Sequence, residues 1–81
     1  MSLLSILLEA ASGLSTGLAT LSAAIAVIGA AYGIGKIGTS ALDAISRQPQ
    51  AANDIRMSMI VVAAFIEGAT LFAIVVCLLA L

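Results

Sequence analysis

The sequence carries very little charge for its length. Its 81 residues include three basic and four acidic side chains, no histidine, and a net charge of −1. A soluble domain is charged at roughly a quarter of its positions, so water is not the main solvent of this chain. There is also no basic patch, which argues against nucleic acid as a partner.

Cysteine and proline are almost absent as well. The single cysteine, Cys77, excludes a disulfide within the chain. Without histidine or a second cysteine, a metal-ligand cluster cannot be built, and we expect no cofactor. Cys77 lies deep in an apolar run, where we interpret it as a small buried hydrophobe.

Most of the sequence consists of two long apolar stretches, residues 14–34 and 57–81. The mean hydropathy of the chain is +1.28. Each stretch exceeds the ~20 residues that a membrane-spanning helix needs. Only helices satisfy every backbone group in hydrocarbon, so strands are excluded. The fold class is therefore an all-α membrane protein, a single two-helix hairpin over 1–81. We expect an N-terminal extension or helix start at about 1–12, helix 1 at about 13–46, a polar loop at about 47–53 and helix 2 at about 54–80.

The polar segment between the stretches contains the only proline, Pro49, which cannot continue a helix and biases Gln48 toward an extended conformation. Asn53 or Asp54 is a plausible N-cap for the second helix. The loop carries Arg47 and Arg56, with Lys36 nearby, whereas neither terminus is basic. The positive-inside rule then places the loop in the cytoplasm and both termini on the opposite side.

The N-terminal stretch is not a typical cleaved signal, because it lacks a basic region and Glu9 interrupts its apolar run. We expect residues from Leu3 onward to extend the first helix past the membrane interface. An N-terminal segment that lies in the membrane interface is equally compatible with these residues, so both arrangements remain open.

Small residues are dense in the first helix. Gly29 with Gly33, and Ala31 with Gly35, each form a small-xxx-small pair that permits close backbone approach. The four alternate along the helix and so are spread around it. This pattern favours a helix crowded on several sides, as in a tightly packed oligomer; the alternative is that glycine is simply common in membrane helices.

A single carboxyl group, Glu67, lies within the second apolar stretch. It is eleven residues past Arg56, or roughly 16 Å at 1.5 Å per residue, which is near the middle of the hydrocarbon. An ionised carboxylate there costs at least a few kcal/mol, so we expect the acid to stay protonated wherever it faces lipid. Such an acid can carry a proton through an apolar phase. Folding the chain about Pro49 puts Glu67 level with Ala30, a small residue that leaves room around it.

Two structural alternatives for Glu67 remain open. It could pair with Lys36, although the two differ in depth by roughly 9 Å in a straight hairpin. It could also be a hydrogen-bonded acid that only holds helices together.

Three motifs in order resemble one family. They are the glycine-rich run 29–35, then Arg47-Gln48-Pro49, then the segment 63–67 that ends in Glu67. Together they are similar to the c subunit of F-type ATP synthase, over nearly the whole chain beyond about Ser22. The chain has no phosphate-binding loop, because its glycine run lacks the Lys-Ser/Thr ending. We therefore expect a non-catalytic component of that complex.

The resemblance implies a homo-oligomeric ring of identical hairpins, surrounded by membrane lipids and turning against the stationary a subunit in the membrane. It implies that Glu67 is the reversibly protonated, ion-carrying residue, and that Arg47, Gln48 and Pro49 contact the gamma and epsilon subunits of the central stalk. It also implies an energy-transducing membrane, for which a bacterial inner membrane is the first expectation.

The resemblance bears on the transported ion too. Sodium-carrying members place a glutamine where this chain has Ile34, a serine or threonine where it has Gly68, and often a tyrosine where it has Phe72. Since few oxygens remain around Glu67, we predict protons, with sodium as the alternative. We expect the ion site to be surrounded by Ala30, Ile34, Phe65, Gly68 and Phe72.

Two other kinds of membrane protein remain as alternatives to the c subunit. An oligomerising, pore-forming hairpin would explain the glycines but not a lone acid in the membrane. A vacuolar-type proteolipid is disfavoured by the Arg-Gln-Pro loop and by one hairpin per chain. Tyr32 is expected to pack against neighbours rather than to approach the ion site.

Overall fold

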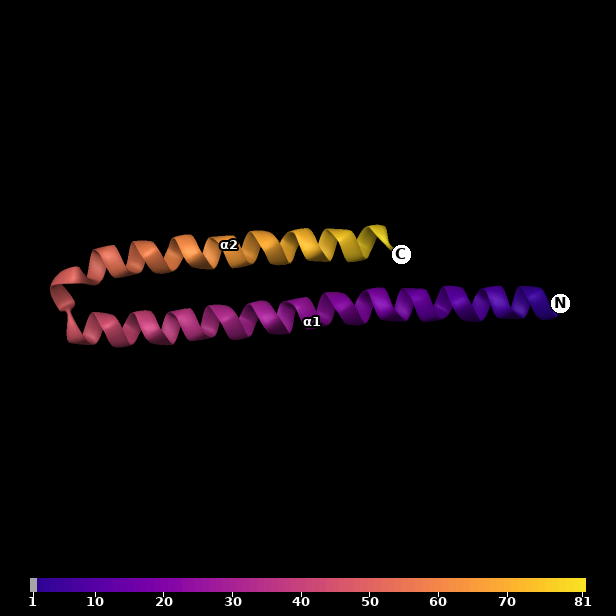
Figure 1. Cartoon of the computed structure of the whole chain (residues 1–81), viewed down its shortest axis with the longest axis horizontal. Coiled ribbons are helices and arrows are strands. Elements are labelled where there is room, and N and C mark those ends of the chain that lie inside the picture. The colour runs from indigo at the N-terminus through magenta and orange to yellow at the C-terminus, as the bar shows by residue number, and fades with distance from the viewer. Residues whose placement is uncertain (1) are drawn as a thin grey trace.

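The computed structural model describes residues 2–81 as two antiparallel helices (Figure 1). Helix α1 runs over Leu3–Arg47 and helix α2 over Ala52–Leu79, with a short 3-10 turn, η1, at Pro49–Ala51. Both long helices are apolar and long enough to cross a membrane. The molecule is a rod with extents of 71 × 17 × 7 Å. The predicted all-α membrane hairpin is confirmed.

Helix α1 begins at the N-terminal end of the described chain. The Ser2 side chain accepts a hydrogen bond of 3.1 Å from the Ser5 backbone N–H, which caps the helix. From Leu3 to Arg47 the helix is continuous, so the 1–12 segment is helical from Leu3, with Met1 outside the described residues. Its N-terminal part extends well beyond the end of α2 (Figure 1).

The turn forms where the proline interrupts helical geometry. Gln48 leaves α1 with φ −134° and ψ 70°, and its N–H donates to the Ala44 carbonyl at 2.9 Å. Pro49 then occupies the first position of η1, where its missing N–H costs nothing.

The predicted N-cap of the second helix is wrong. Helix α2 begins at Ala52 with Ala51 as its N-cap and no side-chain cap bond, so Asn53 and Asp54 lie inside the first turn. The reason is that η1 runs directly into α2, and the Ala52 N–H donates to the Pro49 carbonyl. Asp54 still favours the helix start by lying near the positive end of its dipole.

The two helices meet along a seam of mostly small side chains, spaced three or four residues apart as in coiled-coil packing. Helix α1 contributes half-buried or buried residues at Ala19, Ala23, Ala26, Ala30, Gly33, Ile37, Ala41 and Ala44. Helix α2 contributes half-buried residues at Ala52, Ile55, Met59, Ala63, Ile66, Thr70, Ala73 and Cys77. Cys77 is thus one of the half-buried seam residues.

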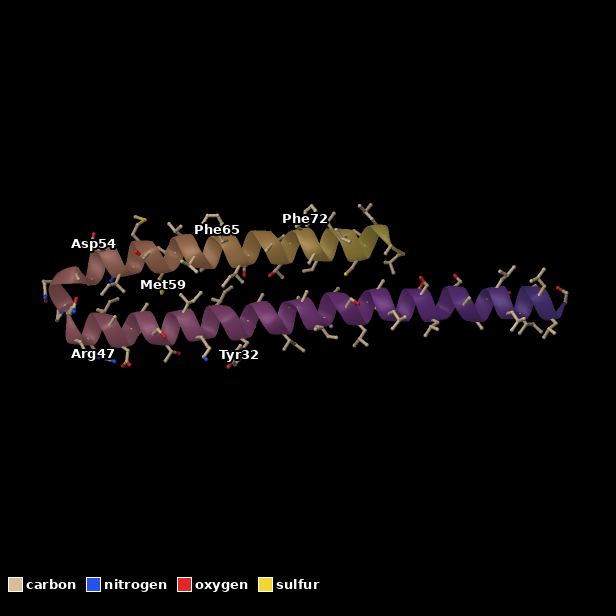
Figure 2. The ribbon with its side chains drawn as sticks, viewed as in Figure 1. Tyr32, Arg47, Asp54, Met59, Phe65 and Phe72 are labelled. Atoms are coloured by element: carbon tan, nitrogen blue, oxygen red, sulfur yellow. The ribbon has the colours of Figure 1, made fainter. Side chains whose placement is uncertain are left out.

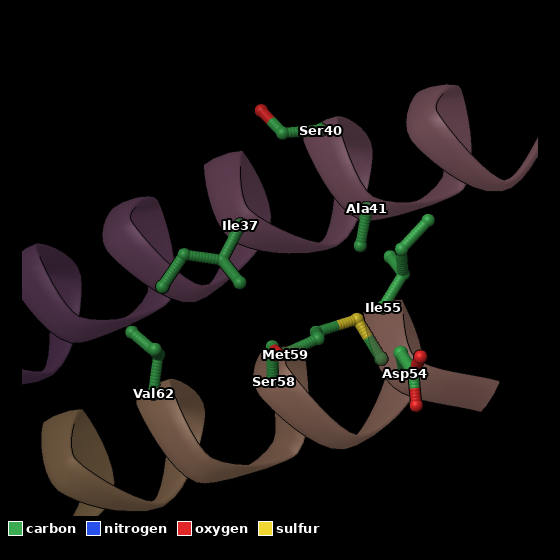
Figure 3. Close-up of a pocket in the computed structure, with 8 residues that line it drawn as sticks. All are labelled: Ile37, Ser40, Ala41, Asp54, Ile55, Ser58, Met59 and Val62. Atoms are coloured by element: carbon green, nitrogen blue, oxygen red, sulfur yellow. The ribbon is translucent and has the colours of Figure 1, made fainter. Parts of the chain in front are cut away.

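Near the turn the seam opens into an apolar groove (Figure 3). Its volume is about 420 Å³, and Ile37 and Ala41 of α1 face Ile55 and Met59 of α2 across it. Ala41 is the one buried residue among those described, at 8% exposure. Most large apolar side chains of the single hairpin remain exposed.

We predict that the seam tolerates alanine but not a large residue at Gly33. A Cβ at Gly33 would lie 3.6 Å from Cδ1 of Ile66, which is ordinary van der Waals contact. Gly33→Ala should therefore be nearly neutral, whereas Gly33→Leu should overpack the seam and destabilise the hairpin by about 1–3 kcal/mol. The free energy of unfolding in detergent micelles measures this, and equal stability of the two variants would contradict the packing described.

Candidate ion-carrying site

Glu67 lies near the middle of α2, at the level of the glycine-rich part of α1. The residue before it, Ile66, packs against Gly33, with Cδ1 3.6 Å from the position of a Cβ there. Beside this contact is a hollow between the helices lined in part by Ala30 and Ala69. The closest packing of the hairpin at this depth is therefore made by residues next to the acid, and not by the acid itself.

Glu67 is exposed on one flank of the hairpin, where a flank is either of the two faces on the sides of the plane that contains both helices. Because Ile66 points at α1, Glu67 lies roughly 100° around the helix from that direction. Within residues 2–81 it has no hydrogen-bond or ion-pair partner, and the one ion pair formed there is Asp43–Arg47 at 3.1 Å. Within one hairpin, Glu67 therefore neither pairs with Lys36 nor forms a hydrogen bond that holds the two helices together.

The residues expected around Glu67 divide between the two flanks. In two antiparallel right-handed helices, the residues that follow a contacting pair share one flank, and those that precede it share the other. For the pair Gly33–Ile66, Ile34 and Glu67 therefore share a flank. Ala30, one turn before Gly33, is half-buried on the side facing α2.

Phe65 and Phe72 lie on the opposite flank. They are roughly 160° and 140° around α2 from Glu67. Both are largely exposed, at 74% and 72%, and Figure 2 shows them directed away from α1. Gly68 is likewise exposed and faces away from α1. Within one hairpin, Ile34 therefore shares the flank of Glu67 and Ala30 lies in the seam at a similar depth, whereas Phe65, Gly68 and Phe72 do not share that flank.

Thr70, three residues after Glu67, carries the one side-chain hydroxyl within a turn after the acid on α2, and its proton is donated to the backbone. Thr70 Oγ1 donates to the Ile66 carbonyl at 2.7 Å, as expected for a lone threonine in a membrane helix. Ala30 and Ile34 have no polar side-chain atoms. The flank of Glu67 thus offers a single carboxyl group in apolar surroundings.

Of the four residues that form the two small-xxx-small pairs, only Gly33 packs against α2 within the hairpin. A Cβ at Gly29 or Gly35 would have no neighbour within 4 Å among the described residues, and Ala31 is exposed. Ala31 and Gly35 help to line a hollow on the surface of α1 that α2 does not cover. Close approach by another helix is what such a surface permits.

The residues of the predicted stalk-contact loop lie together at the tip of the hairpin. Arg47 ends α1, Gln48 joins the helices and Pro49 begins η1. All three are exposed, and Arg47 is held by its ion pair with Asp43 one turn earlier.

A contact between Tyr32 and Lys36 was not anticipated from the sequence. The Lys36 Nζ lies 5.5 Å from the centre of the Tyr32 ring, a cation–π geometry. Tyr32 points away from α2 (Figure 2). The i, i+4 spacing of a cation and an aromatic residue on one helix is the signal that could have revealed it.

The architecture defines a class: small membrane hairpins of two packed helices, with a polar tip and one acid in the second helix. The model of the ATP synthase C-subunit family matches residues 10–80 of this chain. The chain belongs to this family. It is a non-catalytic membrane component of an F-type ATP synthase and forms part of the rotor ring.

Curated relatives match over nearly the whole chain. The ATP synthase c subunit of Phocaeicola vulgatus is 63% identical over 98% of this chain and 96% of its own length. That of Bacteroides thetaiotaomicron is 60% identical over 95% of this chain and 94% of its own. That of Syntrophomonas wolfei is 38% identical over 72% of this chain and 81% of its own. No solved structure is significantly similar to the chain. The family excludes the pore-forming and vacuolar-type alternatives.

Proposed function

We propose that this ring component transports protons, and that Glu67 takes up and releases them. The observation that supports this most is that Glu67 has no hydrogen-bond or ion-pair partner within residues 2–81, and that the one hydroxyl within a turn after it on α2, that of Thr70, donates its proton to the Ile66 carbonyl. A hard metal cation needs several oxygen ligands. A proton needs only the carboxyl oxygen that it protonates.

The ring completes the site around the acid. Identical hairpins in a closed ring make heterologous contacts, in which one flank of each copy meets the other flank of the next. Phe65 and Phe72 of one copy would then cover Glu67 of its neighbour, together with Gly68. Neither the two phenylalanines nor Gly68 adds an oxygen-bearing side chain, and the Tyr32 hydroxyl on the same flank is a single oxygen, fewer than a hard metal cation needs.

The charge state of Glu67 then couples ion flow to rotation. A protonated Glu67 can face lipid, whereas an ionised one needs a nearby cation, because an unpaired charge in hydrocarbon is costly. In this family that cation is expected on the stationary a subunit. One elementary charge crossing 100 mV contributes about 2.3 kcal/mol, so several protons must cross for each ATP made.

The tip of the hairpin is proposed to meet the central stalk on the cytoplasmic side. Arg47, Gln48 and Pro49 are exposed there, free to contact the gamma and epsilon subunits. Arg47 and Arg56 flank the turn, and the positive-inside rule favours the cytoplasm for this end and the opposite side for both termini. The relatives named above are bacterial, which supports the bacterial inner membrane.

A hydrophobic carbodiimide should modify Glu67 in isolated membranes. The reagent reacts with protonated carboxyl groups in apolar surroundings, and Glu67 is the only acid in the middle of an apolar helix. Mass spectrometry of the protein would locate the added mass, with and without sodium. Modification confined to Glu67 and unaffected by sodium is expected; modification at Glu9 or Asp43 instead would refute the assignment, and protection by sodium would refute the choice of ion.

Glu67→Gln should leave the ring assembled but abolish ion-driven ATP synthesis. Glutamine fills a similar volume and cannot exchange a proton, so packing is retained while carriage is lost. Native electrophoresis measures the ring, and an acid–base pulse applied to vesicles measures synthesis. Glu9→Gln, which removes a carboxyl outside the proposed site, is the matched control and should stay active. Loss of the ring in Glu67→Gln would instead favour a structural role for the acid.

A further inference from the structure

Helix α1 has an N-terminal segment that α2 does not reach. Near the end of α2, a hollow between the helices is lined by Ala19 and Thr20 of α1 and by Cys77 of α2. Residues 3–16 lie beyond this level and continue α1 without a break (Figure 1). This N-terminal segment is roughly 20 Å long at 1.5 Å per residue.

The length of α2 places the N-terminal segment beyond the hydrocarbon. About 20 residues of helix cross that layer. Counted from Met57, which follows Arg56 at the start of the apolar stretch, this number is reached at about Val76. The neighbouring Cys77 is level with Ala19 and Thr20, so the earlier residues of α1 project past the hydrocarbon.

The hydroxyl groups of α1 change their bonding at the same level. Thr20 and Ser22 donate to carbonyl groups of their own helix, as hydroxyl groups in a membrane helix commonly do. Within residues 2–81, no hydrogen bond is formed by the side chains of Ser12, Ser15 and Thr16. A hydroxyl without a partner is costly in hydrocarbon and is satisfied in water.

The polar residues of the N-terminal segment form one stripe. They recur at intervals of four, three and four residues, at Ser5, Glu9, Ser12 and Thr16. The same spacing leads on to the half-buried Ala19, Ala23 and Ala26, which face α2. The side of α1 that α2 covers in the membrane therefore becomes polar where α2 ends, as it would if water took the place of that helix.

An apolar row runs along one flank of the N-terminal segment and comprises Leu4, Leu7, Ala11 and Leu14. It lies on average roughly 100° around the helix from the direction of α2. Its flank is that of Tyr32, because Leu4 and Ala11 each precede a residue of the polar stripe just as Tyr32 precedes Gly33. The three leucines of the row are exposed, at 66%, 57% and 65%.

The other flank of the N-terminal segment carries a small residue. Gly13 follows Ser12 and so lies on the flank of Glu67. A Cβ at Gly13 would have no neighbour within 4 Å among the described residues. The two flanks are thus unlike: one bears large apolar side chains and the other has room for them.

The apolar row needs a cover, because a lone helix of this length is marginal in water and exposed leucines there are unfavourable. A membrane surface is one cover. Helices that lie on membranes typically carry Lys or Arg on the polar face and Trp or Phe on the apolar face. Residues 2–16 contain none of these, and their one charge is the acidic Glu9. The segment also keeps the direction of the spanning part of α1 (Figure 1).

A second copy is the cover that the ring provides. Copies related by rotation in a closed ring lie at equal depth, and one flank of each meets the other flank of the next. Because α1 continues straight past the end of α2, this contact continues along the N-terminal segment. The apolar row of one copy then meets the flank of Gly13 in the next, so that large side chains pack against a small one.

We propose that the N-terminal segments of adjacent copies pack together as a helical collar, which extends the ring beyond the membrane. The apolar row of each copy is buried against the Gly13 flank of its neighbour, and the polar stripe stays in water. The collar holds the copies together at the end of the ring remote from the tip. This inference rests on the ring and is independent of the ion that Glu67 carries.

Disulfide trapping in assembled rings tests the contact. In a Cys77→Ala background, Glu9→Cys and Ala11→Cys together place two thiols roughly 160° apart on α1, one toward each flank. In the collar, the thiol at position 11 faces the thiol at position 9 of the next copy. A mild oxidant takes two electrons and two protons from each facing pair to form the disulfide. The double variant should therefore give a ladder of covalent multiples of the 8.1 kDa chain.

The two single variants, Glu9→Cys and Ala11→Cys, are the matched controls. Identical positions in adjacent copies are separated by the full spacing of about 8–10 Å between packed helices. A disulfide needs Cβ atoms about 4 Å apart, so neither single variant should form the ladder. Native electrophoresis confirms that each ring is assembled. An assembled double variant without a ladder, as expected of segments lying on the membrane, would overturn the collar, and so would ladders in the single variants.

Two adjacent leucines give a second test that needs no cross-link. Leu7 belongs to the apolar row, whereas Leu8 is three full turns before the seam residue Ala19 and points to the side on which α2 lies. Both are exposed in one hairpin, at 57% and 62%, and the collar buries Leu7. Leu7→Ser should lower the temperature at which detergent-solubilised rings dissociate, and Leu8→Ser should leave it unchanged. Equal dissociation temperatures for the two variants would refute the collar.

Discussion

The cost of an ionised carboxylate in hydrocarbon is the constraint on which the rest of this molecule depends. Glu67 lies halfway along an apolar helix and has no partner within residues 2–81 of its own hairpin. It is therefore tolerated in lipid only when protonated, or when other chains supply a counter-charge. In the proposed function, a ring of such hairpins meets both conditions in turn as it moves past the stationary a subunit.

The packing of the seam between the helices determines the direction in which Glu67 points. Small residues let α1 and α2 approach closely, and the contact of Gly33 with Ile66 fixes their relative rotation. That rotation directs Glu67 to one flank, and Phe65, Phe72 and the Tyr32–Lys36 pair to the other. The two flanks of one hairpin are thus different surfaces, and a heterologous ring is the assembly in which different surfaces meet.

Much of this could be predicted from the residues. The two apolar stretches and Pro49 predict the two helices and the turn, and the position of Glu67 within its stretch predicts a mid-membrane acid. The N-cap predicted at Asn53 or Asp54 is wrong, because a 3-10 turn after the proline supplies its own backbone bonds. The preferences of side chains for the N-cap position do not predict that a 3-10 turn will lead directly into the helix. The flanks could not be predicted either, because they depend on which residues form the seam, and only the Gly33–Ile66 contact separates Ile34 from Phe65 and Phe72.

The identity of the driving ion is the most direct test of the central claim. The complete synthase would be reconstituted into vesicles, and ATP synthesis driven by an imposed pH difference and membrane potential would be measured in sodium-free and sodium-containing buffers. Proton carriage by Glu67 predicts the same rate of synthesis with and without sodium, and abolition by a protonophore. Synthesis that requires a sodium gradient and survives the protonophore would contradict it.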